Sequence, residues 1–392
     1  MVHHDNALGV VRALRPASPV TLVRPHAAAR AARFFSEKFP GLSMYAVKAN
    51  PSPDLLRVLW DNGITHYDVA SIAEVRLVAE TLPEAKLCFM HPVKSPEAIA
   101  EAYATHGVRT FSLDSMEELE KIVEATNQAT DLTLCVRLRV SSAHSKLSLA
   151  SKFGVSLDEA PAVLLAARQA ADALGVCFHV GSQAMSPQAY AEALSLVRAA
   201  IVQAGVTVDV GGGFPSIYPG MEPIGLEAYF AVIHRAYEAL PISYSAELWC
   251  EPGRALCAEY ASVVVRVEKR KGDVLYINDG AYGSLFDAAH VDWRFPVELI
   301  RETPSTTRDM AFSFYGPTCD DMDFMRGPFE LPADVAAGDY LEIGMLGAYG
   351  CAMRTQFNGF GNVETVAASD EPMASAYLEP VREAATVTRL KK

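Results

Sequence analysis

The sequence lacks the signatures of several common protein classes. None of its seven cysteines forms a CxxC pair, so neither a zinc knuckle nor a disulfide framework is predicted, and a reducing compartment is indicated. No run of about 18 uncharged apolar residues is present, which excludes a predicted membrane span. The opening residues, MVHHDNALGVVRALRP, lack the apolar stretch of a signal peptide, so we expect a cytoplasmic protein.

Positive charge is also scarce. The chain has 392 residues with 34 Lys and Arg against 47 Asp and Glu, a net charge of −13. This balance argues against binding to nucleic acid or to anionic membranes, although it allows a local basic pocket for one phosphate. The adjacent histidines His3 and His4 could bind a metal ion, but at a frayed terminus they indicate no metal site. Half of the residues are apolar, which excludes global disorder.

What the sequence does contain is a regular alternation of predicted strands and helices. Eight short apolar runs lie at 44–50, 66–71, 86–92, 109–115, 133–140, 175–183, 207–215 and 247–256. Between them are helical patterns such as 53–62, 72–80, 116–125, 157–174, 187–204 and 226–240. Eight strand-then-helix units predict a (β/α)8 barrel. A doubly wound open sheet is the alternative, weakened because no GxGxxG opens the first unit.

The pattern changes after residue 261. Residues 262–270 and 273–278 predict a hairpin around Lys271-Gly272, and further strands are expected at 311–315, 340–343 and 357–360. We therefore predict an α/β fold with a TIM-type barrel over residues 25–260. A mainly β domain follows over 261–392, to which residues 1–24 contribute a strand at 19–23.

Chemically active residues recur where the predicted strands end, which is where barrels of this type carry their active sites. They are Lys48, Asp68, His91, Arg137, His179, Gly211, Gly212, Gly213 and Glu251. A lysine in the barrel mouth would be partly desolvated, which lowers its pKa and frees the amine for Schiff-base chemistry. A snorkelling surface lysine is the alternative.

The last two predicted strands carry the residue types of a phosphate site. Three successive glycines can aim backbone N–H groups at an anion, whereas a plain tight turn needs one. Arg254 could clamp the same phosphate and Glu251 could face a ring nitrogen; the alternative is an ion pair at the barrel rim. His179 could stack on a planar ligand, with Ser182 adding an anion contact, or be an ordinary core histidine.

One cofactor explains this combination, namely pyridoxal 5′-phosphate (PLP). In the second domain, Cys319 lies beside Asp320 in a predicted turn and could donate a proton; an idle cysteine is the alternative. The aspartates at 320, 321 and 323 lack the spacing of a calcium loop. A carboxylate that holds a cationic substrate is the better interpretation.

Nine stretches in the same order resemble a known family. They are YAVKAN (45–50), YDVAS (67–71), SKFG (151–154), FHVGSQ (178–183), DVGGGFP (209–215), EPGR (251–254), NDGAYGS (278–284), GPTCDDMD (316–323) and GAYG (347–350). Together they resemble the fold-type III, alanine-racemase-like PLP decarboxylases, in their ornithine/lysine decarboxylase branch. The resemblance implies a PLP barrel, a β domain, and a head-to-tail homodimer with active sites at the interface.

The resemblance also implies roles for individual residues. Lys48 would be the Schiff-base lysine, His179 would stack on the cofactor ring, and Glu251 would pair with the pyridine nitrogen. The phosphate would be held by Ser182, Gly211, Gly212, Gly213, Arg254 and Tyr349. Asp68 and Arg137 match polar positions near the cofactor.

Other matched positions concern the substrate and the dimer. Cys319 would protonate the substrate carbon, delivered from the neighbouring subunit together with Asp320. Asp287 and Asp320 would meet the terminal ammonium of the substrate, with Phe357 nearby. A pair that bridges the dimer corresponds to Lys152 and Asp323.

Two features depart from the family pattern. His91 stands where a small polar residue is expected, and residues 293–310 have no clear counterpart. The prediction is a PLP-dependent decarboxylase of a basic L-amino acid, ornithine to putrescine first and lysine second. An amino-acid racemase on the same fold and a non-catalytic, regulator-binding homologue are the alternatives. Glu251 in place of an arginine at the ring nitrogen argues against the racemase.

Overall fold

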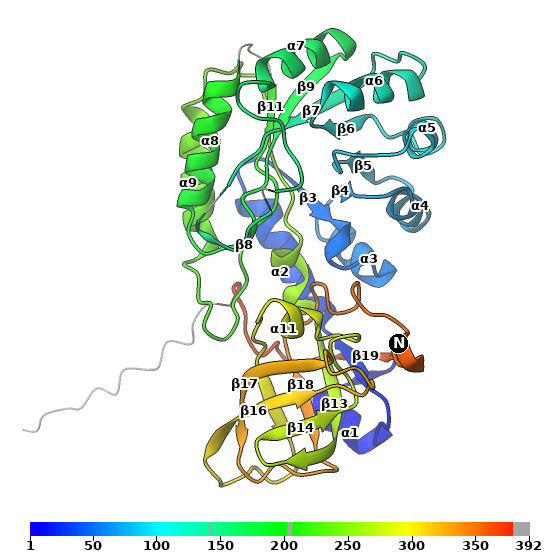
Figure 1. Cartoon of the computed structure of the whole chain (residues 1–392), viewed down its shortest axis with the longest axis vertical. Coiled ribbons are helices and arrows are strands. Elements are labelled where there is room, and N and C mark those ends of the chain that lie inside the picture. Colours follow the sequence, from blue (N-terminus) through cyan, green and yellow to red (C-terminus); the bar gives the residue numbers. More distant parts are fainter. Residues whose placement is uncertain (142, 150, 202–205, 379–392) are drawn as a thin grey trace, which may run out of the picture.

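A computed structural model describes residues 1–141, 143–149, 151–201 and 206–378. Eight parallel strands close into a barrel in chain order (Figure 1). They are β3 (Leu42–Ala46), β4 (His66–Val69), β5 (Lys86–Phe89), β6 (Thr110–Leu113), β7 (Thr133–Arg137), β9 (Ala173–Cys177), β11 (Val206–Asp209) and β12 (Leu248–Cys250). The predicted barrel is therefore confirmed.

Helices alternate with these strands along the chain. They are α2 (Pro25–Lys38), α3 (Pro53–Asp61), α4 (Ile72–Thr81), α5 (Pro96–Ala104), α6 (Met116–Ala125), α7 (Ala160–Ala170), α8 (Gln188–Ala200) and α9 (Leu226–Glu238). Local chemistry fixes several starts: the side chains of Ser71, Ser95 and Ser115 each accept a hydrogen bond from a backbone N–H in the first turn. The described helices include none that is long and apolar enough to cross a membrane.

Two predicted helix ends need comment. The helix expected over 157–174 ends at Ala170, because Ala173–Cys177 is β9, which pairs with β7 and β11. The apolar run LGVC fits a helix face and a buried strand equally well, and the pairing decides it. The helix expected over 187–204 ends at Ala200, and residues 202–204 lie outside the described residues.

The interior of the barrel is rich in sulfur. Met44, Cys88, Met90, Cys135, Cys177 and Trp249 form a separate buried cluster. Gly175 lies against this cluster, and a Cβ there would come within 2.5 Å of the Cys135 sulfur. All seven cysteines lie in the described part of the chain and are free, so five of them serve as small buried side chains while Cys319 and Cys351 retain solvent access.

The second part of the chain is a nine-stranded sheet centred on β13 (Ala261–Lys271). Its other strands are β1 (His3–His4), β2 (Val20–Val23), β14 (Val274–Ile277), β15 (Val297–Ile300), β16 (Asp309–Tyr315), β17 (Phe324–Pro332), β18 (Tyr340–Ile343) and β19 (Glu364–Ala368). Strand β2 runs antiparallel to β13, with Thr21 opposite Val263. The N-terminal segment is thus part of this β domain.

Three details of the β domain differ from the sequence prediction. Residues Phe357–Gly359 form a short 3-10 turn (η3) rather than a strand, with Asn358 in the left-handed region at φ 55°. His3 and His4 are not frayed, because β1 pairs in parallel with β19. Helix α1 (Ala7–Leu14) was not predicted; Asn6 caps it by accepting a hydrogen bond from the N–H of Gly9.

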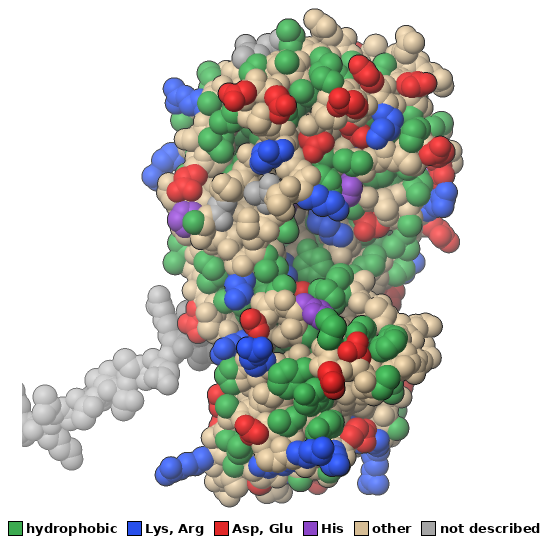
Figure 2. Space-filling view, in the orientation of Figure 1, with side chains coloured by type: hydrophobic (Ala, Val, Ile, Leu, Met, Phe, Trp, Pro, Cys, Tyr) green, Lys and Arg blue, Asp and Glu red, His purple; other side chains and the backbone are tan. Residues whose placement is uncertain are grey.

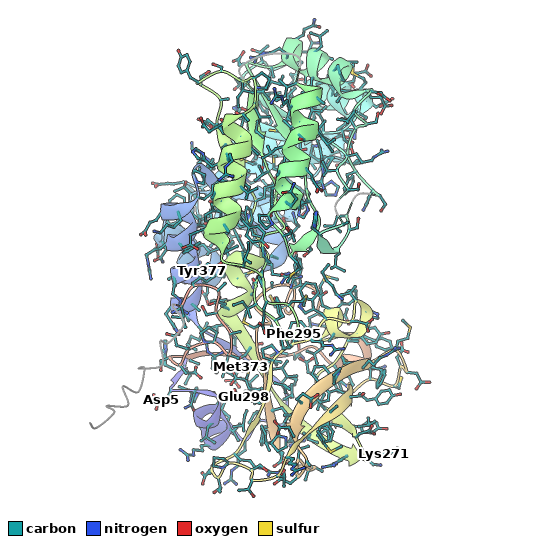
Figure 3. All side chains as sticks on the ribbon, turned by 90° about the vertical axis from the view of Figure 1, so that its left-hand side faces the viewer. Asp5, Lys271, Phe295, Glu298, Met373 and Tyr377 are labelled. Carbon is teal, nitrogen blue, oxygen red and sulfur yellow. The ribbon has the colours of Figure 1, made fainter. Side chains whose placement is uncertain are left out.

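The segment from Asp370 to Tyr377, which we call the strap, ties the barrel to the β domain. Asp370 accepts two hydrogen bonds from the buried Arg24, which precedes α2. Met373 packs against Gly344 beside β18, and the Tyr377 hydroxyl donates to the carbonyl of Ala255. Figure 3 shows Met373 beside the β domain and Tyr377 beside the barrel.

Acidic and basic side chains are interspersed on the face seen in Figure 2.

Candidate active site

A cavity of about 350 Å³ opens where the barrel strands end. Five residues that the resemblance assigned to the cofactor line it together: Lys48, Asp68, Arg137, His179 and Glu251. Its wall is completed by Ala70, Met90, His91, Pro92, Ser148, Leu149, Ser151, Lys152 and Phe153. The carboxyl ends of the strands thus gather these groups from distant parts of the sequence.

Lys48 lies in a short 3-10 turn, η1 (Val47–Ala49), directly after β3. Its Nζ donates to Oδ2 of Asp68 at 2.9 Å, and Asp68 comes from the neighbouring strand β4. The β domain fixes the turn from the other side. The N–H of Tyr349 donates to the carbonyl of Ala49 at 2.7 Å, and the Asn50 side chain donates to the carbonyl of Gly347 at 2.8 Å.

The electrostatics of Lys48 differ from the prediction. Desolvation lowers its pKa, but the nearby carboxylates of Asp68 and Glu251 more than compensate, so the pKa lies above its usual value. The expectation of a lowered pKa is therefore wrong for the chain without its cofactor. A lone lysine at a strand end gives no sign that two acids will surround it. The amine must pass on a proton before it can act as a nucleophile.

Two buried acids lie at the ends of β11 and β12. Burial raises the pKa of Glu251 well above its usual value, and the nearby Asp209 carboxylate raises it further. Burial also raises the pKa of Asp209 to about 6. Oδ1 of Asp209 accepts a hydrogen bond from the N–H of Gly211, and the carboxyl groups of Asp209 and Glu251 are hydrogen-bonded to each other. The sequence analysis missed Asp209, although an acid between the valines of TVDV is a signal for a buried carboxylate.

The three glycines allow the backbone to pass closely between His179 and Glu251. A Cβ on Gly211 would come within 2.0 Å of the carbonyl of Phe178, and its φ is +67°. On Gly212 it would lie 2.8 Å from the carbonyl of Glu251 and 3.1 Å from Nε2 of His179. A simple turn does not require each glycine to lie this close to neighbouring atoms. The segment is therefore a cradle, that is, a space which any side chain on these residues would fill.

The His179 ring is held as a neutral stacking surface. Its Nδ1 accepts a hydrogen bond from the N–H of Gly181 at 3.0 Å, which leaves the ring hydrogen on Nε2. Burial lowers the His179 pKa well below its usual value, and Arg137 lowers it further. Ser182 follows in the short strand β10 (Ser182–Ala184), opposite Leu147 of β8 (Ser145–Leu147).

Arg254 begins α10 (Arg254–Cys257) and is buried. Its Nη1 donates to the Tyr218 hydroxyl at 3.1 Å and its Nη2 to Oδ2 of Asp287 at 3.4 Å, while Nε has no partner. The ring of Tyr349 lies 5.0 Å from the guanidinium. A buried guanidinium with an unpaired N–H is suited to an anion, so Arg254 and the glycine cradle fit a phosphate.

The residues predicted to meet the substrate are divided. Asp287 lies in α11 (Phe286–His290) against Arg254, not beside Asp320. The Asp320 carboxylate accepts a hydrogen bond from the Tyr282 hydroxyl at 2.5 Å, and the ring of Phe357 lies 4.8 Å from that of Tyr282.

Cys319 is exposed next to Asp320, and both line a second cavity, on the β domain. The cavity that holds Lys48 does not include either residue. One chain therefore presents two separate groups of predicted site residues.

Three further positions need comment. The buried Asp323 accepts hydrogen bonds from the N–H of Ala281 and from the N–H and hydroxyl of Thr318, so it stabilises its own turn. Its pairing with Lys152 across a dimer stays a prediction. His91 lines the barrel cavity with its ring edge-on to Phe153 at 5.1 Å. No cluster of potential metal ligands occurs among the described residues.

The mouth of the (β/α)8 barrel holds a lysine amine, buried acids, a neutral imidazole face and a cradle for a phosphate. These features define the class of barrel-type pyridoxal-phosphate enzymes. The family model "Pyridoxal-dependent decarboxylase, pyridoxal binding domain" matches residues 26–258, more than half of the chain. The chain belongs to this family of PLP-dependent decarboxylases, with pyridoxal phosphate as its cofactor.

Individual relatives agree with this family. The chain is 32% identical to a lysine/ornithine decarboxylase of Selenomonas ruminantium, over 85% of each sequence. A solved lysine/ornithine decarboxylase of Vibrio vulnificus, complexed with putrescine, superposes with a TM-score of 0.79 at 29% identity, covering 93% of this chain and 99% of the other. An arginine decarboxylase of Paramecium bursaria Chlorella virus, bound to agmatine, gives 0.81 at 25% identity, covering 91% and 98%.

Proposed function

We propose that the protein decarboxylates a basic L-amino acid, L-ornithine first, to putrescine and CO2, with L-lysine as the second candidate. The preference for a substrate with a basic side chain is inferred from Asp320. Its hydrogen bond from Tyr282 lowers the pKa of the carboxyl group, which keeps it negatively charged, and its side chain is accessible for a terminal ammonium. The substrates named for the relatives support the same class.

When bound, pyridoxal phosphate supplies the electron sink that allows the carboxylate to leave as CO2. Lys48 carries the cofactor, and Asp68 holds its Nζ in the cavity mouth. Glu251, which is hydrogen-bonded to Asp209, would keep a proton at the ring nitrogen, and the neutral face of His179 would cover the ring. The phosphate is held by Ser182, Gly211, Gly212, Gly213, Arg254 and Tyr349, while Arg137 lies at the polar edge of the site.

The second group of residues completes the site from another chain. Cys319 donates the proton that replaces CO2 on the substrate carbon, and Asp320 binds the distal ammonium, with Phe357 beside it. The separation of these residues from Lys48 within one chain supports a homodimer with shared active sites. The free cysteines support a reducing compartment, and we place the protein in the cytoplasm.

The direct test is product identification. Purified protein with PLP is incubated with L-ornithine, L-lysine and L-arginine, and the products are separated by chromatography. We expect putrescine to form with the highest kcat/KM and cadaverine with a lower one. A D-amino acid in place of an amine would show a racemase, and the absence of any product would refute the proposed activity.

A further inference from the structure

The segment that follows Asp287 closes over Arg254. Helix α11 ends at His290, and the N–H of Trp293 then donates to the carbonyl of Asp287 at 3.1 Å. The indole ring lies over the guanidinium of Arg254, whose central carbon is 4.1 Å from the ring centroid. Trp293 is only 1% exposed, and Figure 3 shows the nearby Phe295 in the part of the β domain that faces the barrel.

Hydrogen bonds and aromatic rings restrain the guanidinium group of Arg254. The Tyr218 hydroxyl accepts one hydrogen bond from Nη1, and the Asp287 carboxylate accepts one from Nη2. The Tyr218 ring stands edge-on to Trp293, with their centroids 5.2 Å apart. Nε and the second hydrogen of each terminal nitrogen remain for an anion.

The choice of tryptophan at this position is not explained by packing alone. Its indole N–H is buried without a hydrogen-bond partner, which destabilises the folded chain. A phenylalanine or leucine would fill apolar space without that cost. What tryptophan adds is the aromatic face that attracts a cation most strongly. The contact with Arg254 uses this property.

We propose that Trp293 is a positioning residue for the cofactor phosphate, acting through Arg254. It holds the guanidinium in one orientation, so that the free N–H groups are arranged before the phosphate arrives. This inference rests on the proposed role of Arg254 as the phosphate-binding arginine. It gives a function to the first residue of the 293–310 segment, which has no clear counterpart in the family motifs.

The test compares the affinities of the apoenzyme for PLP and for pyridoxal, which lacks only the phosphate. Trp293→Leu should weaken PLP binding about 30-fold, since cation–π contacts of desolvated cations are of that size, and should change pyridoxal binding less than twofold. Trp293→Phe keeps an aromatic face and should lose only about threefold. Affinities are measured by absorbance titration, and folding by circular dichroism.

Two further variants separate the possible outcomes. Phe295→Leu removes a buried ring of the same segment that contacts Tyr218, with centroids 5.8 Å apart, and it should leave the ratio of PLP to pyridoxal affinity unchanged. Arg254→Met should lower this ratio strongly; if it does not, the proposed phosphate site itself is wrong. If Arg254→Met lowers the ratio but Trp293→Leu weakens both ligands equally or neither, the positioning role is overturned. Should Trp293→Leu fail to fold, Trp293→Phe decides by the same ratio.

Discussion

Lys48 shares the barrel mouth with the carboxylates of Asp68, Asp209 and Glu251, and the balance among these groups sets the protonation of the site. The acids raise the pKa of Lys48, while burial raises the pKa of Glu251 and Asp209. Each of these shifts favours the protonated form of its group before the cofactor binds.

The first prediction concerns Lys48. Reduction of the holoenzyme with borohydride should fix the cofactor to the peptide that contains Lys48, because this amine is in the cavity with Glu251. Lys48→Ala should lower kcat by about 10²–10⁴-fold or more, the range for losing a group that transfers protons in the reaction. Mass spectrometry of the reduced, digested protein identifies the peptide. Label on any other lysine would disprove the assignment.

The second prediction separates the two aspartates of the proposed substrate pocket. Asp320→Asn should lower kcat/KM for ornithine by at least about 30-fold, because a charged partner of the ammonium is lost. With norvaline, which has no terminal ammonium, the change should be small, and PLP affinity should not alter. Asp287→Asn should weaken PLP binding as well, since Asp287 contacts Arg254. Equal losses of Asp320→Asn on both substrates would contradict the basic-substrate proposal.

Several site residues were accessible to sequence reasoning and others were not. Lys48, Glu251 and Arg254 stand at predicted strand ends, so the barrel pattern alone directs attention to them. Tyr218 and Trp293 were missed, because their importance comes from contacts between segments far apart in the chain. The raised pKa of Lys48 was missed for the same reason.

At the scale of elements, the strap and the short 3-10 turn η2 (Ala258–Tyr260) meet at Glu259. This buried side chain accepts hydrogen bonds from the Ser375 hydroxyl at 2.6 Å and the Ala376 N–H at 2.8 Å, and Arg30 lies 3.7 Å away. Burial raises the pKa of Glu259 to about 7, although these partners oppose the shift. The contact between strap and barrel therefore depends on pH.

The third prediction gives the sign of this dependence. Between the unfolded pKa near 4.3 and the folded value, the folded chain binds more protons, so stability is highest below this window and falls as pH rises through it. The loss in the free energy of unfolding amounts to about 4 kcal/mol at most. Glu259→Gln should remove most of it, seen as a smaller shift of the urea midpoint between pH 5.5 and 8.5. Glu120→Gln, on the exposed face of α6, serves as the control. An unchanged shift would show that Glu259 stays ionised.

Element boundaries followed from sequence where local chemistry sets them. Met116–Ala125 and Tyr340–Ile343 match their predicted ranges, and Ser115 caps the first of these. The errors fall where tertiary pairing decides. The segment 173–174 joins a strand because β7 and β11 flank it, and the strands β15, β17 and β19 are defined by partners that no local pattern reveals.

At the scale of the whole molecule, the β domain does two things for the barrel. Its GAYG segment fixes the turn that carries Lys48, and its α11 and Trp293 hold Arg254. Yet Cys319 and Asp320 of the same domain line a different cavity from Lys48. The domain thus supports the cofactor site of its own chain, while its proposed proton donor lies apart from that site.

The fourth prediction follows from that division. Lys48→Ala and Cys319→Ala should each be nearly inactive alone. When the two variants are mixed and exchange subunits, half of the dimers are mixed, and each mixed dimer has one intact site. Activity should then recover to about a quarter of the wild-type value, because half of the dimers each keep half of their sites. Exchange is checked by mass spectrometry of differently tagged chains. A homodimer whose sites each come from one chain would exchange equally well and recover no activity, since every site would carry one lesion.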